Sequence, residues 1–142
     1  MDGVWAFEEI DDTLPLVPIA ARRALDLAGV HLSLEGWRRL PLEQRRALVN
    51  AGNLEVVARS EVLARCMEAH GVSAVTPEED PSQPPEMLCT YGATADITAA
   101  WLSLSRVARY AVLLGARSAA KRGDRARLTL VVRALLPSLI EP

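Results

Sequence analysis

Two cysteines and two histidines are the residues with the clearest capacity for metal chemistry. Cys66 and His70 lie four residues apart in a stretch with helical periodicity, a spacing that places both on one face and can bind zinc. His31 and Cys89 would complete a Cys₂His₂ set. The four residues lack the paired CxxC spacing of structural zinc sites, and Leu63 shares the face of Cys66. We therefore interpret that face as the edge of a core and predict no metal site.

A run of acidic residues near the N-terminus is the second group with catalytic potential: Glu8, Glu9, Asp11 and Asp12. Paired carboxylates can act as general acid and base. No His or Lys lies near this run in the sequence, so we interpret it as a solvated charge run. Gly-rich phosphate loops and Ser/His/Asp spacings are absent from the sequence. We predict a protein that is not an enzyme, with no catalytic residue and no cofactor.

Two tryptophan–arginine pairs are the remaining candidates. Trp37 and Trp101 are each followed by Leu, Arg and Ala at matching positions, and the arginines are Arg45 and Arg109. We interpret the match as two degenerate helical repeats, each with a short Trp-bearing helix followed by an Arg-bearing helix. Core packing is the favoured role of the tryptophans, and structural pairing is that of the arginines. Partner binding by all four residues is the alternative, and both interpretations stay open.

The elements that must position these residues are predicted to be helical. Pro18 suits the first turn of a helix that ends at Gly29, and Arg22 and Asp26 can pair across one of its turns. A long helix is expected over residues 54–71. Its apolar face would carry Val56, Leu63, Cys66, Met67 and His70.

The second half of the chain shows the same helical periodicity. Ser105 can cap one helix and Asp124 can cap the last one. Their inward faces would carry Val107, Tyr110, Ala111 and Leu114 in the first, and Leu128, Val131, Val132 and Leu135 in the second. No run alternates with period two for long enough to predict a strand, so the predicted fold class is all-α.

A proline-rich acidic linker divides the chain and its charge. Residues 1–80 hold 14 Asp and Glu against eight Arg, a net charge of −6, whereas residues 81–142 hold four acidic residues against eight basic ones, a net charge of +4. We expect one small helical domain over residues 1–142. Its parts would be a first repeat over about 14–52, the long helix over about 54–71, the linker over 75–86, a second repeat over about 87–120 and a final helix over about 124–137.

Length and composition exclude several classes of protein. The chain has 142 residues, of which 50% are hydrophobic and 24% charged, so one domain with a core is expected rather than a disordered chain. A net charge of −2 disfavours a generally basic nucleic-acid binder. Two Cys are too few for a disulfide scaffold, and neither a signal peptide nor an apolar stretch of membrane-spanning length is visible. We expect a cytoplasmic protein with reduced thiols.

One set of residues carries a family resemblance. It comprises Trp5, Phe7, Glu8, Pro18, Arg22, Leu25, Asp26, Gly29, Leu32, Leu34, Trp37, Leu40, Arg45 and Leu48, and then Thr98, Trp101, Leu104, Arg109, Tyr110 and Ala111. In this pattern the chain resembles the nitrate reductase-associated protein family, small proteins encoded near assimilatory nitrate reductase or molybdenum-cofactor genes. Ala24 stands where a basic residue is common, and residues 119–124 replace a His-containing polar segment. The resemblance implies a non-enzymatic accessory or maturation factor whose partner is nitrate reductase or another molybdoenzyme.

The basic second half leaves an alternative of a different class open. Seven basic residues flank or line two consecutive helices, as in a small regulatory or DNA-binding module: Arg106, Arg109, Arg117, Lys121, Arg122, Arg125 and Arg127. The last helix is apolar along most of its length, whereas a recognition helix needs several polar groups on its exposed face. Nucleic-acid binding is therefore disfavoured, and a homodimer through residues 128–136 also stays open.

Overall fold

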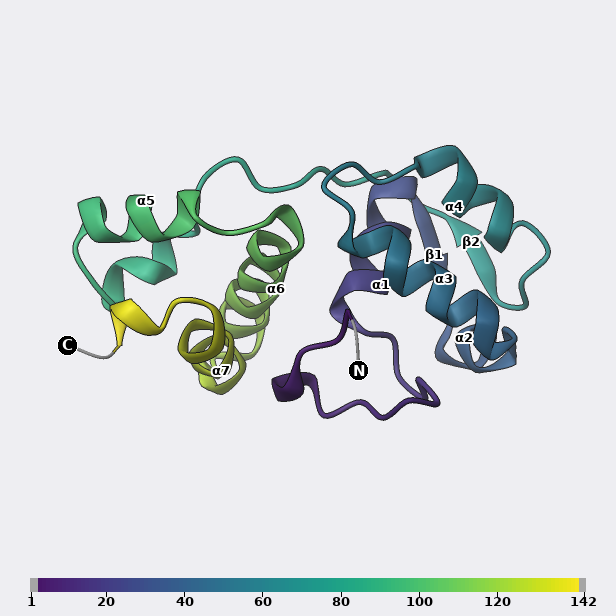
Figure 1. Cartoon of the computed structure of the whole chain (residues 1–142), viewed down its shortest axis with the longest axis horizontal. Helices are drawn as coiled ribbons and strands as arrows, with labels where there is room; N and C mark the ends of the chain where they lie inside the picture. The colour runs from purple at the N-terminus through teal and green to yellow at the C-terminus, as the bar shows by residue number, and fades with distance from the viewer. Residues whose placement is uncertain (1–2, 141–142) are drawn as a thin grey trace. The chain divides into compact units, whose positions relative to one another are not determined.

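The computed structural model describes residues 3–140 and is mostly helical (Figure 1). It divides into two compact units, the first ending at Glu79 and the second beginning at Asp80. The first unit contains the 3₁₀ helix η1 (Ala6–Glu8), α1 (Ile19–Ala28), β1 (Val30–Leu32), α2 (Leu34–Arg39), α3 (Leu42–Asn53), α4 (Arg59–Cys66) and β2 (Val72–Ala74). The second contains η2 (Glu86–Thr90), α5 (Thr94–Leu102), α6 (Arg106–Arg122), α7 (Ala126–Leu135) and η3 (Pro137–Leu139). The expectation of a single domain over 1–142 stays a prediction.

The core of the first unit is the contact between α1 and α3. α1 buries the small side chains of Ala20, Ala21 and Ala24. Gly52, in the last turn of α3, lies so close to α1 that a β-carbon there would overlap the backbone carbonyl of Ala20. Because the distance between packed helices depends on the side chains at their contact, these small residues allow α1 and α3 to approach closely.

A buried arginine ends α3 and explains why the long helix predicted over residues 54–71 is wrong. Arg23 is fully buried in α1. Its guanidinium donates to the carbonyl oxygens of Gly52 at 2.8 Å, Leu54 at 2.6 Å and Glu55 at 3.0 Å. A carbonyl aimed at Arg23 is directed away from the amide four residues on, which a continuing helix requires. The chain therefore leaves the helical path after α3, and only the eight residues of α4 are helical.

The predicted buried face of that helix is also corrected. Of its five members, only Cys66 is buried. Val56 is 72% exposed, Met67 is 73% exposed, and Leu63 and His70 are exposed as well. Val62 and Cys66 form the inward face of α4 instead. The stretch between α3 and α4 is not helical, so the helical periodicity does not continue from residue 54 into α4. A buried face counted from residue 54 therefore contains the wrong residues.

The all-α prediction is corrected by a minor antiparallel sheet in the first unit. β1 pairs with β2 in the register Val30 with Ala74, His31 with Ser73 and Leu32 with Val72. Gly29, at a φ of 76°, ends α1 in the left-handed conformation as predicted and leads directly into β1. Strands of three residues are too short to display an alternating pattern in the sequence.

The second unit is built on the packing of α6 against α7. The hydroxyl of Ser105 accepts from the amide of Ala108 at 3.3 Å, which confirms the predicted cap of α6. The N-cap residue of α7 is Arg125 rather than the predicted Asp124, although the Asp124 carboxylate accepts from the amide of Ala126 at 2.9 Å. The predicted inward positions Val107, Tyr110, Ala111, Leu128, Val131 and Val132 are buried, and Leu114 and Leu135 are half-buried.

Side-chain contacts attach η2 to α7 in the second unit. The guanidinium of Arg125 lies 5.1 Å from the centre of the Tyr91 ring and bonds to the hydroxyl of Thr90. The hydroxyls of Tyr91 and Thr129 are 2.8 Å apart. α5 packs against η2 and η3. The second unit, as described over residues 80–140, has no counterpart of the β1–β2 sheet, so a repeat of the whole unit is not shown.

Candidate functional site: two tryptophan–arginine pairs

The first pair holds a segment of its own unit. Trp37 is fully buried in α2, and its indole N–H donates to the carbonyl of Leu14 at 2.8 Å. Arg45 donates through Nη1 to the carbonyls of Thr13 at 2.6 Å and Leu14 at 3.1 Å. Arg38 donates to the carbonyl of Pro15 at 2.9 Å. The three side chains thus bind three successive carbonyls, and we call residues 13–15 the clasped segment.

The clasped segment has an unusual backbone. Leu14 is fully buried and has a φ of 50°, in the left-handed region that L-residues other than Gly, Asn and Asp rarely adopt. Such a conformation costs on the order of 1–3 kcal/mol and persists only where the surroundings enforce it. Here the buried Leu14 side chain and the donors from Trp37 and Arg45 supply that enforcement.

The second pair has a similar local arrangement. Arg109 is the fourth residue of α6, as Arg45 is the fourth residue of α3, and each follows its tryptophan by eight residues. The Arg45 Nε donates to the carbonyl of Leu40 at 3.1 Å, and the Arg109 Nε donates to that of Trp101 at 3.2 Å. Arg45 thus binds the C-cap residue of α2, three residues after its tryptophan, whereas Arg109 binds the last turn of α5, at Trp101 and, through Nη2, at the carbonyl of Leu102 at 3.3 Å. The Arg109 guanidinium also lies 5.7 Å from the centre of the Trp101 ring.

The two pairs differ in what the indole N–H meets. Trp101 is 2% exposed, and its buried Nε1 has no hydrogen-bond partner among the described residues. The Trp37 Nε1 is paired with the clasped segment. The core role predicted for both tryptophans is confirmed by their burial, and the structural role predicted for both arginines by their hydrogen bonds. Partner binding by Trp37, Arg45, Trp101 and Arg109 stays a prediction.

The cysteines and histidines do not form a common cluster. Cys66 is buried, and this burial raises the pKa of its thiol, while Cys89, His31 and His70 are exposed. The nearest acid to the His70 ring is Glu35, with Nε2 and Oε2 3.6 Å apart. Across residues 3–140, no group of three or more His, Cys, Asp or Glu side chains is placed to hold a metal ion.

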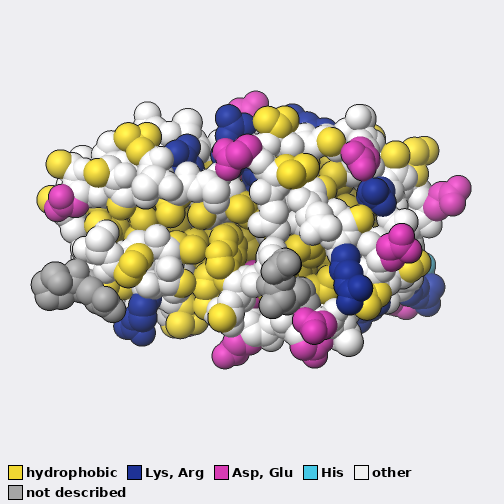
Figure 2. Space-filling model, in the orientation of Figure 1, with side chains coloured by type: hydrophobic (Ala, Val, Ile, Leu, Met, Phe, Trp, Pro, Cys, Tyr) yellow, Lys and Arg dark blue, Asp and Glu magenta, His cyan; other side chains and the backbone are white. Residues whose placement is uncertain are grey.

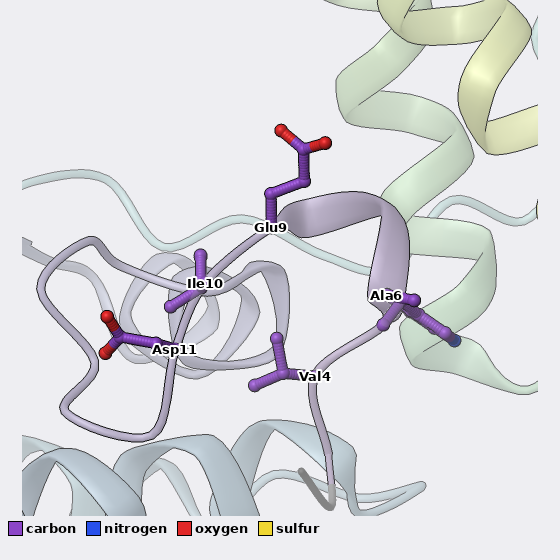
Figure 3. A pocket seen from close by; sticks show the side chains of 6 residues that line it. Val4, Ala6, Glu9, Ile10 and Asp11 are labelled. Carbon is purple, nitrogen blue, oxygen red and sulfur yellow. The ribbon is translucent and has the colours of Figure 1, made fainter.

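The acidic run serves the backbone of the N-terminal segment. Glu8 accepts from the amide of Ile19 at 2.6 Å, at the start of α1. Asp11 accepts from the hydroxyl and the amide of Thr13, and these two bonds lower the pKa of its carboxyl group. Glu9 and Asp11 border an open pocket with Val4, Trp5, Ala6 and Ile10, but their carboxylates point in different directions (Figure 3). They are therefore not arranged as an acid–base pair.

Sequence reasoning missed three residues that define these sites. Arg38 and Leu14 complete the first pair, and Arg23 is the most buried charge of the described chain. By residue type Arg23 does not differ from its neighbour Arg22, which forms the predicted ion pair with Asp26 at 3.2 Å. The only available signal was the alanine spacing of α1, which places position 23 next to the buried positions 20 and 24.

These features define a class: a small, mostly helical protein in which Trp37, Arg45 and Arg109 bind backbone carbonyls. Within the described part of the chain, no helix is both long and apolar enough to span a bilayer. The model of the conserved nitrate reductase-associated protein family matches residues 4–127. The chain therefore belongs to that family, which confirms the resemblance noted in the sequence. No curated protein and no solved structure matches the chain.

Proposed function

We propose that this protein is a non-enzymatic accessory or maturation factor that binds a molybdoenzyme, with nitrate reductase as the first candidate. Membership of the nitrate reductase-associated family over residues 4–127 carries the proposal. The hydrogen bonds of Trp37, Arg45 and Arg109 go to backbone carbonyls of this chain, so partner binding by these residues remains part of the proposal.

The mechanism we propose is that the protein holds its partner in a state that accepts the molybdenum cofactor. The two halves of the chain differ in net charge, −6 over residues 1–80 and +4 over residues 81–142. Each unit also exposes large apolar side chains, Val56 and Met67 in the first and Leu102 and Leu130 in the second. Exposed apolar side chains can add contact area to a protein interface, and unlike charges favour docking to complementary surfaces.

Two measurements on the native host test this function. The tagged full chain is expected to co-purify with nitrate reductase, and a deletion strain is expected to contain reductase polypeptide with lowered activity and lowered molybdenum content. Re-expression of the wild-type chain in the deletion strain is the control and should restore both quantities. Absence of the reductase from the purified complex, together with normal reductase activity in the deletion strain, would contradict the proposal.

The DNA-binding alternative receives less support from the second unit. The guanidinium groups of Arg109 and Arg125, two of its seven basic residues, lie over the rings of Trp101 and Tyr91. A DNA-binding module would show affinity at low salt that falls steeply as salt rises, because phosphate contacts release counterions. We expect no such affinity. The homodimer through residues 128–136 stays a prediction.

A further inference from the structure

We propose that the Trp101–Arg109 pair of the second unit is a docking site for an extended, acidic, leucine-containing segment of the partner protein. The proposal rests on the proposed function, because the segment belongs to the protein that the chain binds. To the proposed function it adds the binding site on this chain, the Trp101–Arg109 pair, and the kind of partner segment that binds there.

The first observation is the buried indole N–H of Trp101. Trp101 is 2% exposed, and its Nε1 has no acceptor among the described residues. A buried donor without an acceptor is unfavourable, because it has lost its bonds to water and gained none in exchange. An incoming backbone carbonyl would remove that penalty, so the site gains from a ligand that presents one.

The second observation is the ligand of the corresponding pair. Trp37 and Arg45 together bind the carbonyls of Thr13 and Leu14, and the Leu14 side chain is completely buried beside them. The Arg109 Nε and Nη2 already bind the carbonyls of Trp101 and Leu102, which leaves Nη1, the atom with which Arg45 binds the clasped segment. In the first unit, a tryptophan N–H and an arginine Nη1 at this spacing bind an extended segment with a leucine.

The third observation is the apolar surface of the second unit. Leu102, which follows Trp101 directly, is 67% exposed, whereas Arg38 occupies the same place after Trp37. Apolar side chains gather on one face of the second unit over the area between α5 and α7, and that face is hollowed there (Figure 2). The exposed Leu102 side chain can contact an apolar side chain of a bound segment, the leucine above all.

Charge indicates the character of the residues around that leucine. Residues 81–142 carry a net charge of +4. In the first unit, the clasped segment directly follows Asp11 and Asp12. An acidic segment is attracted to the second unit by its net charge, and a basic one is repelled.

Binding requires a small rearrangement. The indole N–H is covered in the free protein, so the incoming segment must displace the side chains that cover it. Association that waits for such a step is slower than ordinary docking. Slow association is therefore part of the expected behaviour.

A peptide with the chain's own sequence over residues 8–17, EEIDDTLPLV, is the probe. A fluorescent form of this peptide is expected to bind the full-length protein saturably. A control peptide in which Asp replaces the leucine that corresponds to Leu14 is expected not to bind. Arg109→Lys keeps the charge but loses the planar fork, so it should weaken binding roughly tenfold, as the loss of a charge-assisted hydrogen bond does. Arg127→Lys, at an exposed position of α7, is the matched control and should leave affinity unchanged.

The two tryptophans supply a second test that does not depend on the peptide. Trp37→Phe and Trp101→Phe remove the same atoms from buried rings, but only Trp37 loses a hydrogen bond. Trp37→Phe is therefore expected to lower the melting temperature more than Trp101→Phe, while Trp101→Phe abolishes peptide binding. Equal losses of stability, or peptide binding that Arg45→Lys abolishes and Arg109→Lys leaves intact, would overturn the proposed site.

Co-purification separates failure of the site from failure of the proposed function. If wild-type and Arg109→Lys chains retain nitrate reductase equally, the docking site is refuted and the accessory function stands. If the wild-type chain retains no reductase, the accessory function fails. Loss of the reductase from the Arg109→Lys chain alone, with Arg127→Lys unaffected, is the result that we expect.

Discussion

Replacement of Gly52 by alanine tests the close approach of α1 and α3 most directly. Two effects of opposite sign compete. Alanine is the better helix former by about 1 kcal/mol, so propensity alone predicts stabilisation. The added β-carbon, however, would overlap the backbone carbonyl of Ala20, which cannot swing aside as a flexible side chain can.

The packing effect is the larger of the two. Overfilling a tightly packed contact typically costs about 1–3 kcal/mol. A shift of α3 would also disturb the carbonyl of Gly52, which accepts from Arg23 at 2.8 Å, and a hydrogen bond to a charged group is worth about 1.5–3 kcal/mol. After subtraction of the propensity gain, we expect Gly52→Ala to destabilise the first unit by about 1.5–5 kcal/mol. For a domain of this size, that loss lowers the melting temperature by roughly 6 °C or more.

Thermal unfolding followed by far-ultraviolet circular dichroism measures this effect. Gly92→Ala is the matched control, because a β-carbon there meets only Leu139 Cδ2, at the ordinary contact distance of 3.4 Å. We expect the control to unfold within a few degrees of the wild-type protein. A Gly52→Ala protein as stable as the wild type, or more stable, would show that propensity outweighs packing and that α1 and α3 are farther apart than described.

Two further predictions concern titratable groups. A thiol reagent at neutral pH should modify the exposed Cys89 quickly and Cys66 slowly, because burial both shields the Cys66 thiol and raises its pKa. Equal rates of modification would contradict the burial of Cys66 in α4. Thr13→Ala should raise the pKa of Asp11 toward its usual range, because the Thr13 hydroxyl is the main cause that lowers it. Because this pKa is lowered in the folded state, Asp11 contributes stability above its unfolded-state pKa, and this stability is lost as the pH falls through the folded-state pKa. The Thr13→Ala protein should therefore lose less stability in acid than the wild type. A nuclear magnetic resonance titration that finds the Asp11 pKa unchanged in the variant would refute the assignment.

Features that depend on neighbouring residues could be predicted from the sequence. The cap at Ser105, the left-handed end of α1 at Gly29 and the pairing of Arg22 with Asp26 each involve residues within one helical turn. Local spacing and residue type are sufficient for such features. The inward faces of α6 and α7 were predictable for the same reason.

Features that depend on distant residues could not be predicted. Arg23 and the carbonyl of Gly52 are 29 positions apart, and this contact ends α3 where periodicity alone extended a helix. The β1–β2 sheet joins Leu32 to Val72 across an even longer separation. At the candidate site, the spacing of Trp37 and Arg45 was visible, but their acceptor was not. Leu14 precedes a proline, a position that favours extended backbone, so the sequence did not indicate its positive φ.

The buried Arg23 has a consequence for the order in which the first unit comes apart. A buried lysine can lose its proton and become neutral, but an arginine stays charged at every pH at which proteins fold. Its three carbonyl acceptors must therefore be in place whenever α1 is packed, since a bare guanidinium cannot remain in the core. The turn that follows α3 thus behaves as part of the core rather than as a loop. Its backbone cannot open without also unpacking α1, so the two open and close as one cooperative unit.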